Sequence, residues 1–409
     1  MDILPILSTL RRHKLTAWLL ILEIALTCAI VCNAVFLIGQ RLERMNIQSG
    51  VAEHELVQVQ MAHIGHRPDS DARIETALAA LRQIPGVRQV AMTGSMPLSS
   101  GGSSNGDLKL DPQQQQKTAN TAQYMGENLL ATLGTKLVAG REFRPDEYVD
   151  FDTAVAALRS GDLKGLPQDL IITRTLAERL WPGQSPLGKT VYYGKGIPFR
   201  VIGVIAHLAR PNSLQLGAEY STVWPIRMSG QRDSYVIRCA PQDRAQVLKS
   251  AVATLKKLDP DSVVLEQRTY DEARHAFFAS DRAMAGILVG VCVALLIVTA
   301  LGIVGLASFW VAQRRRTIGV RRALGATRRN ILHYFQTENF LLATFGIVLG
   351  MVLAYGINLF LMLHYELPRL PAVYFPVGAI VLWLIGQGAV LGPALRAAAV
   401  PPVVATRSV

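Results

Sequence analysis

Four apolar stretches constrain this chain more than any other feature of its sequence. An α-helix rises about 1.5 Å per residue and the hydrocarbon of a bilayer is about 30 Å thick, so about 20 apolar residues are needed to cross it. The mean hydropathy of +0.26 agrees with several such segments. The first stretch is too long for a signal-peptide core, and we interpret it as an uncleaved span. The sequence predicts transmembrane helices at residues 15–39, 283–312, 340–363 and 372–395.

The arginines and lysines beside these spans predict their orientation. Positive residues are enriched in cytoplasmic loops, and the loop between the third and fourth spans contains only Arg369. The other basic residues near the spans lie before the first span, between the second and third spans, and after the fourth. They are Arg11, Arg12, Lys14, Arg314, Arg315, Arg316, Arg321, Arg322, Arg328, Arg329, Arg396 and Arg407. We therefore expect a multi-pass protein of the cytoplasmic membrane. The predicted cytoplasmic segments are residues 1–14, 313–339 and 396–409, and the predicted outer segments are residues 40–282 and 364–371.

The net charge of +12 has the same origin. A basic chain can bind nucleic acid, but here the arginine clusters lie beside membrane spans. The charge is therefore an orientation signal, and we expect no nucleic-acid partner.

Residues that carry catalytic or metal chemistry are scattered along the chain. Cys28, Cys32 and Cys292 lie inside the spans, which leaves Cys239 without an intramolecular disulfide partner outside them. His63 and His66 are the closest histidine pair and lack a third metal ligand. We expect neither an enzyme nor a bound cofactor or metal.

The outer segment, residues 40–282, has the pattern of an α+β domain. Strands are predicted at residues 54–61, 87–93, 234–239 and 262–267, and helices at 69–84 and 243–258. Two strand–helix–strand units separated by an insert, at about residues 97–232, indicate a split α+β sandwich. The predicted fold is thus an α-helical membrane protein with four spans and a large extracytoplasmic α+β domain.

The ends of this domain run toward the spans without a break in helical pattern. No glycine or proline interrupts residues 270–282, so we predict one continuous helix into the second span, and the first span is expected to continue through residues 40–47. Two such stalks could transmit rigid-body movement. Inside the insert we expect a mobile loop at residues 99–117 and a hairpin formed by residues 190–193 and 199–205.

Residues 183–190 fit the phosphate-loop pattern G-x-x-x-x-G-K-[ST]. That loop requires a strand before it and a helix after it. Here the predicted helix precedes the segment and the predicted strand follows it, and Pro186 lacks an amide hydrogen. We therefore interpret the segment as a turn leading into a hairpin.

Several segments together resemble the MacB/FtsX-like ABC transporter permeases. The run RRRTIGVRRALGATRR at residues 314–329 is similar to their cytoplasmic signature. Leu133-Gly134 followed by Gly140-Arg141-Glu142-Phe143 resembles the family's "LG…GR.F" segment. Residues 176–189, 201–205 and 393–401 resemble further family segments, in the family's order.

The resemblance implies a permease without a fused ATPase domain. Family members dimerise, so a second protomer is expected, either an identical chain or a close paralogue. ATP and Mg²⁺ would bind a separate cytoplasmic ABC ATPase. Its closure would move the spans, and the stalks would pass that motion to the outer domain, which is called mechanotransmission.

The arginine-rich segment would be the contact with that ATPase. The family's signature usually has an acidic residue where this chain has Thr317, so an ion pair made by that acid is not available here. We expect apolar side chains to enter a groove of the ATPase, flanked by arginines. The expected coupling residues are Ile318, Gly319, Val320, Arg321, Ala323, Leu324, Gly325 and Ala326.

Polar residues within the spans form a second group of candidates. A mid-membrane acid costs about 3 kcal/mol on translocon scales, so Glu23, with Thr27 one turn further on, should face protein or water. Glu23 could be a protonation switch or a neutral, hydrogen-bonded interface residue. Glu338 is expected to pair with an arginine of the neighbouring loop at the membrane interface.

Two pairs of glycines, Gly286/Gly290 and Gly346/Gly350, have the small-xxx-small spacing that lets helix backbones approach closely. We expect them to pack against helices of the same or of a second protomer.

Two functions fit the resemblance. The first is an efflux or export permease, which in efflux members of the family works with a periplasmic adaptor and an outer-membrane channel. The second is a non-transporting regulatory module of the cell-division type, whose outer domain activates a partner.

Overall fold

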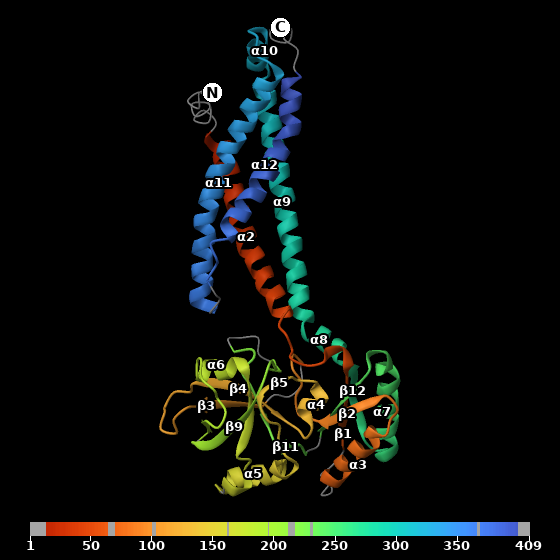
Figure 1. The fold of residues 1–409 in the computed structure, drawn as a ribbon. Helices are drawn as coiled ribbons and strands as arrows, with labels where there is room; N and C mark the ends of the chain where they lie inside the picture. The colour runs from red at the N-terminus through yellow and green to blue at the C-terminus, as the bar shows by residue number, and fades with distance from the viewer. Residues whose placement is uncertain are drawn as a thin grey trace. The chain divides into compact units, whose positions relative to one another are not determined.

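The computed structural model describes residues 14–63, 70–99, 104–161, 163–194, 196–211, 217–229, 232–365 and 369–399. Arg11, Arg12, His66, Pro401 and Arg407 lie outside this part of the chain. The protein divides into two compact units (Figure 1). Met1–Met45 and Asp281–Val409 form a helical unit, and Asn46–Ser280 form an α+β unit, the outer domain.

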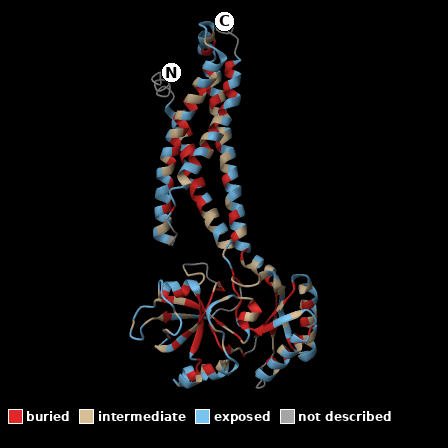
Figure 2. Ribbon diagram, in the orientation of Figure 1, coloured by how far each residue is buried: buried red, intermediate tan, exposed pale blue. Residues whose placement is uncertain are grey.

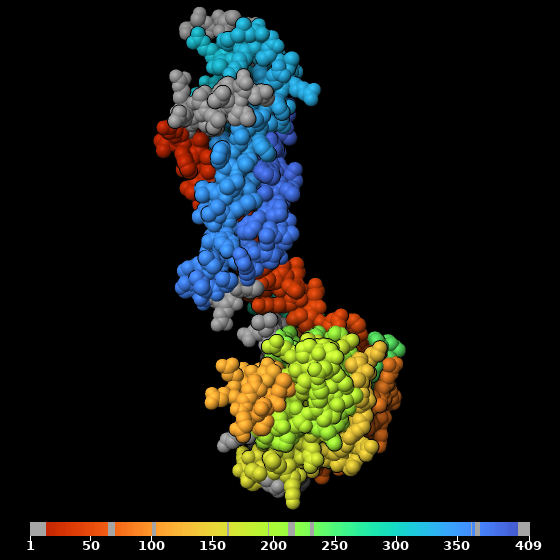
Figure 3. Space-filling model, turned by 60° about the vertical axis from the view of Figure 1, so that its left-hand side comes forward, coloured from red at the N-terminus to blue at the C-terminus, as the bar shows by residue number. Residues whose placement is uncertain are grey.

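The helical unit confirms the four predicted spans. Within the described residues, four helices are long and apolar enough to cross a membrane. Three helices extend beyond both predicted bounds, whereas the fourth begins two residues later and ends three residues later than predicted. They are α2 (Lys14–Met45), α9 (Ala279–Gln313), α11 (Arg328–Tyr365) and α12 (Tyr374–Ala398). In the most apolar part of α2, 56% of the residues are buried, against 17% in α9. The helix α2 is therefore the centre of the unit, and in Figure 3 atoms of α11 and α12 cover its middle.

Gly346 and Gly350 of α11 allow this helix to approach α2 closely. A Cβ atom on Gly346 would lie 2.8 Å from Cβ of Ile24, and one on Gly350 would lie 2.5 Å from Cβ of Cys28. These glycines pack within the chain, as small residues do between membrane helices. Gly286 and Gly290 on α9 differ, because no described atom lies within 4 Å of their Cβ positions.

The outer domain contains the predicted split sheet. Its strand order is β13-β1-β12-β2, with antiparallel neighbours. The strands are β1 (Leu56–Ala62), β2 (Val87–Met92), β12 (Arg232–Cys239) and β13 (Val263–Thr269). Helices α3 (Ser70–Arg82) and α7 (Arg244–Leu258) share a core with this sheet through Val59, Leu81 and Val247 (Figure 2). Both predicted strand–helix–strand units are confirmed.

The insert forms a second sheet whose pairings close into a ring. The ring runs β9-β7-β10-β4-β3-β8 and returns to β9, while β5 (Leu137–Gly140) pairs with the last residues of β9. Its strands are β3 (Ser104–Lys109), β4 (Ala119–Met125), β7 (Asp169–Thr173), β8 (Thr190–Tyr193), β9 (Ile197–Ile205) and β10 (Ser221–Trp224). The aromatic side chains of Tyr193, Phe199 and Trp224 pack edge to face in the core of this closed sheet. The predicted hairpin is confirmed as β8 and β9.

Shorter elements complete this part of the domain. They are α4 (Leu129–Leu133), α5 (Phe151–Ser160), α6 (Arg174–Leu180), β6 (Val149–Asp150), β11 (Ile226–Arg227) and the 3₁₀ turns Glu53–Glu55, Pro145–Glu147, Leu163–Gly165 and Pro241–Asp243.

Two sequence predictions about this unit were wrong. Residues 104–109 of the expected loop form β3, because pairing with β4 and β8 satisfies the backbone hydrogen bonds of a segment with little apolar content.

The expected continuous helix at residues 270–282 is broken between α8 (Tyr270–Phe277) and α9. Phe278 at the break is 2% exposed, with φ −89° and ψ 10°. Tertiary burial of its ring, and not a glycine or proline, accompanies the interruption.

The glycine packing leads to a stability prediction. Gly350→Leu should lower the free energy of unfolding by about 1–3 kcal/mol, which is the usual cost of overpacking a core. The Cβ atom of the new leucine alone would overlap Cβ of Cys28. Gly356→Leu on the same helix is the control, since no described atom lies within 4 Å of that Cβ position. Thermal unfolding of the detergent-purified protein measures both. Equal loss of stability in the two variants would contradict this packing.

Candidate functional site

The arginine-rich segment between α9 and α11 forms a short helix and an exposed turn. The helix α10 spans Arg315–Ala323, and the turn that follows contains Gly325 with φ +94°, a left-handed conformation that favours glycine. Leu324 is 83% exposed and Val320 is 44% exposed. Arg321 and Ala323 are exposed as well. A large exposed leucine at a turn beside arginines is a surface suited to docking.

The predicted bounds of this segment need correction. Residues 328–339, expected in the loop, are the first turns of α11. Ile318 and Gly319 were expected among the docking residues, but both are buried. Ile318 belongs to the same apolar cluster as Ile331 and Phe335 of α11. The sequence pattern could not distinguish the side of α10 that packs on its own chain from the side that is open. Ala326 is half-buried, and Gly325 is exposed.

A buried ion pair holds this segment to α11. Arg314 Nη1 donates to both carboxylate oxygens of Glu338, at 3.1 and 3.0 Å. The side chains are 14% and 2% exposed, and the guanidinium also lies over the ring of Trp310. The expected pairing of Glu338 with a loop arginine is therefore present in the structure. A pair this well buried is expensive to break, because one charge would lose its partner in a low-dielectric setting.

Two further arginines attach the segment to neighbouring helices. Arg322 Nη1 donates to the carbonyl of Ala398 at the end of α12, at 2.5 Å. The guanidinium of Arg321 lies over the ring of Tyr334 on α11, 5.1 Å from its centroid. The exposed turn is thus mounted on the ends of α9, α11 and α12.

Inside the membrane unit, Glu23 and Thr27 of α2 both face α9. Thr27 Oγ1 and Thr299 Oγ1 are 2.8 Å apart. A Cβ on Gly302 would lie 2.5 Å from Glu23 Oε1, so the carboxylate rests against the backbone of α9. No hydrogen bond to this carboxylate occurs within the described residues. Both interpretations of Glu23 therefore stay open.

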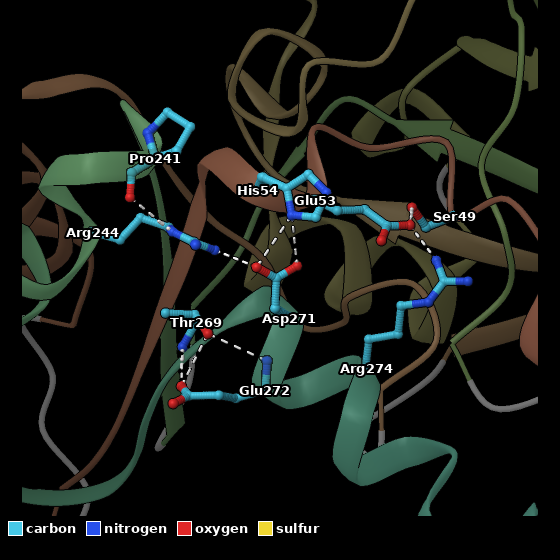
Figure 4. Close-up of polar contacts among 9 residues, drawn as sticks. All are labelled: Ser49, Glu53, His54, Pro241, Arg244, Thr269, Asp271, Glu272 and Arg274. Atoms are coloured by element: carbon cyan, nitrogen blue, oxygen red, sulfur yellow. Dashed lines mark hydrogen bonds and ion pairs between the residues drawn. The ribbon is translucent and has the colours of Figure 1, made fainter. Parts of the chain in front are cut away.

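In the outer domain, a polar network surrounds the start of α8 (Figure 4). Thr269 and Glu272 cap the helix reciprocally. Tyr270 Oη donates to the carbonyl of Pro97 at 2.8 Å, and burial raises the pKa of Tyr270, which keeps its phenol protonated. Burial opposes ionisation of Asp271, but hydrogen bonds from Arg244 and His54 outweigh it and lower the pKa of that carboxyl. The Thr269-x-x-Glu272 spacing is a capping-box signal in the sequence, but the contacts of α8 with His54, Pro97 and Arg244 carry none, because these residues are far from α8 in the chain.

The phosphate-loop pattern has the reversed context that the sequence predicts. The helix α6 precedes the segment and β8 follows it. Lys189 Nζ donates to Gln184 Oε1 at 2.6 Å and lies over the ring of Trp181. The lysine is thus used to hold its own turn.

The histidine considered as a metal ligand has carboxylate partners on both ring nitrogens. His63 Nε2 lies 2.7 Å from Asp233 Oδ2, and Nδ1 lies 2.8 Å from Asp259 Oδ2. The two carboxylates are on opposite sides of the ring and cannot share one ion with it. In the part of the chain that the structure describes, no group of three or more potential ligands is arranged to hold a metal.

Two protein families match the chain. Residues 19–255 match the MacB-like periplasmic core domain, and residues 289–402 match the FtsX-like permease C-terminal family.

Relatives match parts of the chain. The macrolide export ATP-binding/permease protein MacB of Bradyrhizobium diazoefficiens is 30% identical over 232 residues, covering 54% of this chain and 34% of that protein. MacB of Chromobacterium violaceum is 27% identical over 239 residues, covering 57% and 34%. The uncharacterized ABC transporter permease YvrN of Bacillus subtilis is 26% identical over 282 residues, covering 64% and 68%. The chain thus spans about a third of the length of the MacB relatives.

A solved structure is also similar. The periplasmic region of MacB from Actinobacillus actinomycetemcomitans is 17% identical, with a TM-score of 0.34, and the match covers 57% of this chain and 97% of that one.

The buried pair beside the exposed turn leads to a second prediction. Arg314→Ala should lower stability by about 3–5 kcal/mol, because Glu338 loses its guanidinium partner inside the helical core. The double variant Arg314→Met, Glu338→Leu should recover most of the loss, because it removes both charges. Arg315→Ala, an exposed arginine one residue away, serves as the control. Thermal unfolding of the variants in detergent measures these changes in stability. A smaller loss of stability in Arg314→Ala than in Arg315→Ala would refute the role of the pair.

Proposed function

Because the chain belongs to the family of MacB- and FtsX-like ABC transporter permeases, we propose that it is the permease subunit of an export complex driven by a separate cytoplasmic ATPase. Members of this family are multi-pass proteins of the inner membrane with a periplasmic domain, and the four apolar helices and the outer domain agree with this. ATP and Mg²⁺ would bind the ATPase chain. The working principle is mechanotransmission, in which ATPase closure moves the spans and the outer domain follows.

The observation that carries this proposal is the exposed turn after α10. Leu324 is 83% exposed although it is a large apolar residue, and it lies at a turn held to three helix ends by Arg314, Arg321 and Arg322. A partner that binds Leu324 would therefore push on a rigid mount and not on a mobile loop. We assign the ATPase contact to the exposed residues Val320, Arg321, Ala323, Leu324 and Gly325, with Ala326 at the border.

We place the second permease protomer against α9. This helix has the highest mean hydropathy of the four spans, 3.0 over its most apolar window, yet only 17% of that window is buried in the single chain. Gly286 and Gly290 leave its surface open to a closely packed helix. A periplasmic adaptor and an outer-membrane channel would complete an efflux complex.

The family also supports a second candidate function, since an FtsX-like C-terminal region is present. In that case the same chain would move its outer domain to activate a partner and transport nothing. Native purification with mass spectrometry distinguishes the two, because an adaptor and channel would accompany an exporter.

Removing the exposed leucine tests the ATPase contact. Leu324→Asp should weaken ATPase binding about tenfold, or about 1.4 kcal/mol, because a charge replaces the apolar anchor. Leu158→Asp is the matched control, since Leu158 is 57% exposed but lies in the outer domain. Co-purification and stimulated ATP hydrolysis are the measurements. Unchanged stimulation in Leu324→Asp would count against the contact.

The role of Glu23 can be decided in the same complex. If Glu23 exchanges a proton during the cycle, Glu23→Gln should abolish the pH dependence of ATP-driven activity. If it is a neutral contact against α9, the variant should keep the wild-type pH profile. Activity measured between pH 5.5 and 8 separates the two interpretations.

A further inference from the structure

The chain joins the outer domain to the helical unit at two places. It enters after α2 ends at Met45, and it leaves through α8 and Phe278. These two connections are the covalent routes by which movement of the spans can reach the outer domain. Their attachment to each other therefore decides whether the outer domain receives one motion or two.

A single arginine on the exit helix contacts the entry segment twice. Arg274 Nη2 donates to the carbonyl of Ile47 at 2.8 Å, two residues after α2 ends. Arg274 Nη1 forms an ion pair with Glu53 Oε1 (Figure 4). The guanidinium also lies over the ring of Phe278, 5.7 Å from its centroid. One side chain thus spans the entry segment, the exit helix and the residue at which the exit helix ends.

The carboxylate partner is itself held in place. Ser49 Oγ donates to Glu53 Oε1 at 2.5 Å. The side chains of Arg274 and Glu53 are 19% and 25% exposed, so this charge-assisted pair is screened less than a surface pair. A second ion pair between described residues of the two segments, His54 with Asp271, involves a histidine side chain that is 76% exposed and charged only when protonated.

Each segment also has its own attachment to the domain. The carbonyl of Ser49 accepts from the amide of Ala209, and Ala52 N donates to the carbonyl of Leu133 at 2.8 Å, which ties the entry segment to the insert. The exit helix is tied through Tyr270 to Pro97 and through Asp271 to Arg244 on α7. The two connections continue into neighbouring strands, since Val57 of β1 pairs with Thr269 of β13, and Arg274 joins them outside that pairing.

We propose that Arg274 and Glu53 form a clamp that makes the entry and exit segments move as one piece. Its consequence for transport rests on the proposed function, because the motion passed through the clamp would come from the ATPase. With the clamp closed, displacement of either span moves the whole outer domain. With the clamp open, only the stretches between the Arg41–Asp281 ion pair of the spans and the Val57–Thr269 strand pairing of the domain can shift separately, and part of the motion is lost there.

The separation between the segments tests the clamp directly. Gln48→Cys and Ala276→Cys place spin labels on exposed positions of the entry and exit segments, and the four native cysteines are buried. Electron–electron resonance on the full-length protein in nanodiscs should give one narrow distance. Arg274→Ala should lose it and give a broad distribution. Arg274→Lys should also broaden it, because an ammonium cannot fork across Glu53 and Ile47 as a guanidinium does.

Two controls separate the clamp from a general loss of stability. Arg238→Ala removes a matched contact, since Arg238 bonds Glu55 and the carbonyl of Ala131 at similar exposure but does not touch α8. It should keep the narrow distance. The reversed pair Glu53→Arg, Arg274→Glu restores the ion pair but leaves the Ile47 carbonyl without its donor, so it should narrow the distribution only as far as Arg274→Lys does. A narrow distance retained in Arg274→Ala, or equal broadening in Arg238→Ala, would overturn the proposal.

The measurement needs neither ATP nor the ATPase chain. Its failure would therefore remove the clamp and leave the proposed function standing. Normal ATPase stimulation in Leu324→Asp would instead weaken the proposed function, whatever the distance shows.

Discussion

A charge that is buried inside protein needs a partner, and this constraint organises the helical unit. Glu338 is buried among apolar helices, and its contact with Arg314 brings the end of α9 against α11. The same arginine stacks on Trp310, and Arg322 reaches the last turn of α12. These contacts turn a strongly basic segment, which would otherwise be held only by headgroups, into a rigid mount for one exposed leucine. The stiffness of the docking surface thus follows from the cost of leaving these charges unpaired.

The length of the apolar stretches was enough to predict the spans, because crossing hydrocarbon sets a minimum that few soluble helices reach. The period of the apolar residues was enough to predict β1-α3-β2 and β12-α7-β13. Local sequence failed at Phe278, where no glycine or proline marks the break. It failed again at β3, whose pairing partners β4 and β8 lie further along the chain. Both failures come from tertiary contacts that override local preference.

In the helical unit, residues with the same local sequence pattern differ in burial. Gly286/Gly290 and Gly346/Gly350 have identical spacing, yet only the second pair meets a helix of the same chain. Ile318 and Leu324 are both apolar residues of one short segment, yet one is 6% exposed and the other 83%. Spacing identifies which residues could pack closely or dock. The direction each one faces depends on where α2 and α11 lie, which a single sequence does not encode locally.

The unequal packing of the spans bears on how motion could arise. Helices α2, α11 and α12 share an apolar core to which α9 adds Ile303, Ala307 and Trp310, whereas only 17% of the most apolar part of α9 is buried. The contact between Thr27 and Thr299 and the approach of Glu23 to Gly302 lie along the α2–α9 seam. A hydroxyl pair is worth little net free energy and can re-form after a small slide. The Arg41–Asp281 ion pair joins the end of α2 to the start of α9, so a slide of α9 on α2 must shift or break that pair before the exit connection moves relative to the entry connection. A shear of that kind would reach the outer domain as one displacement only if the two connections were joined, which is the role assigned to Arg274 and Glu53.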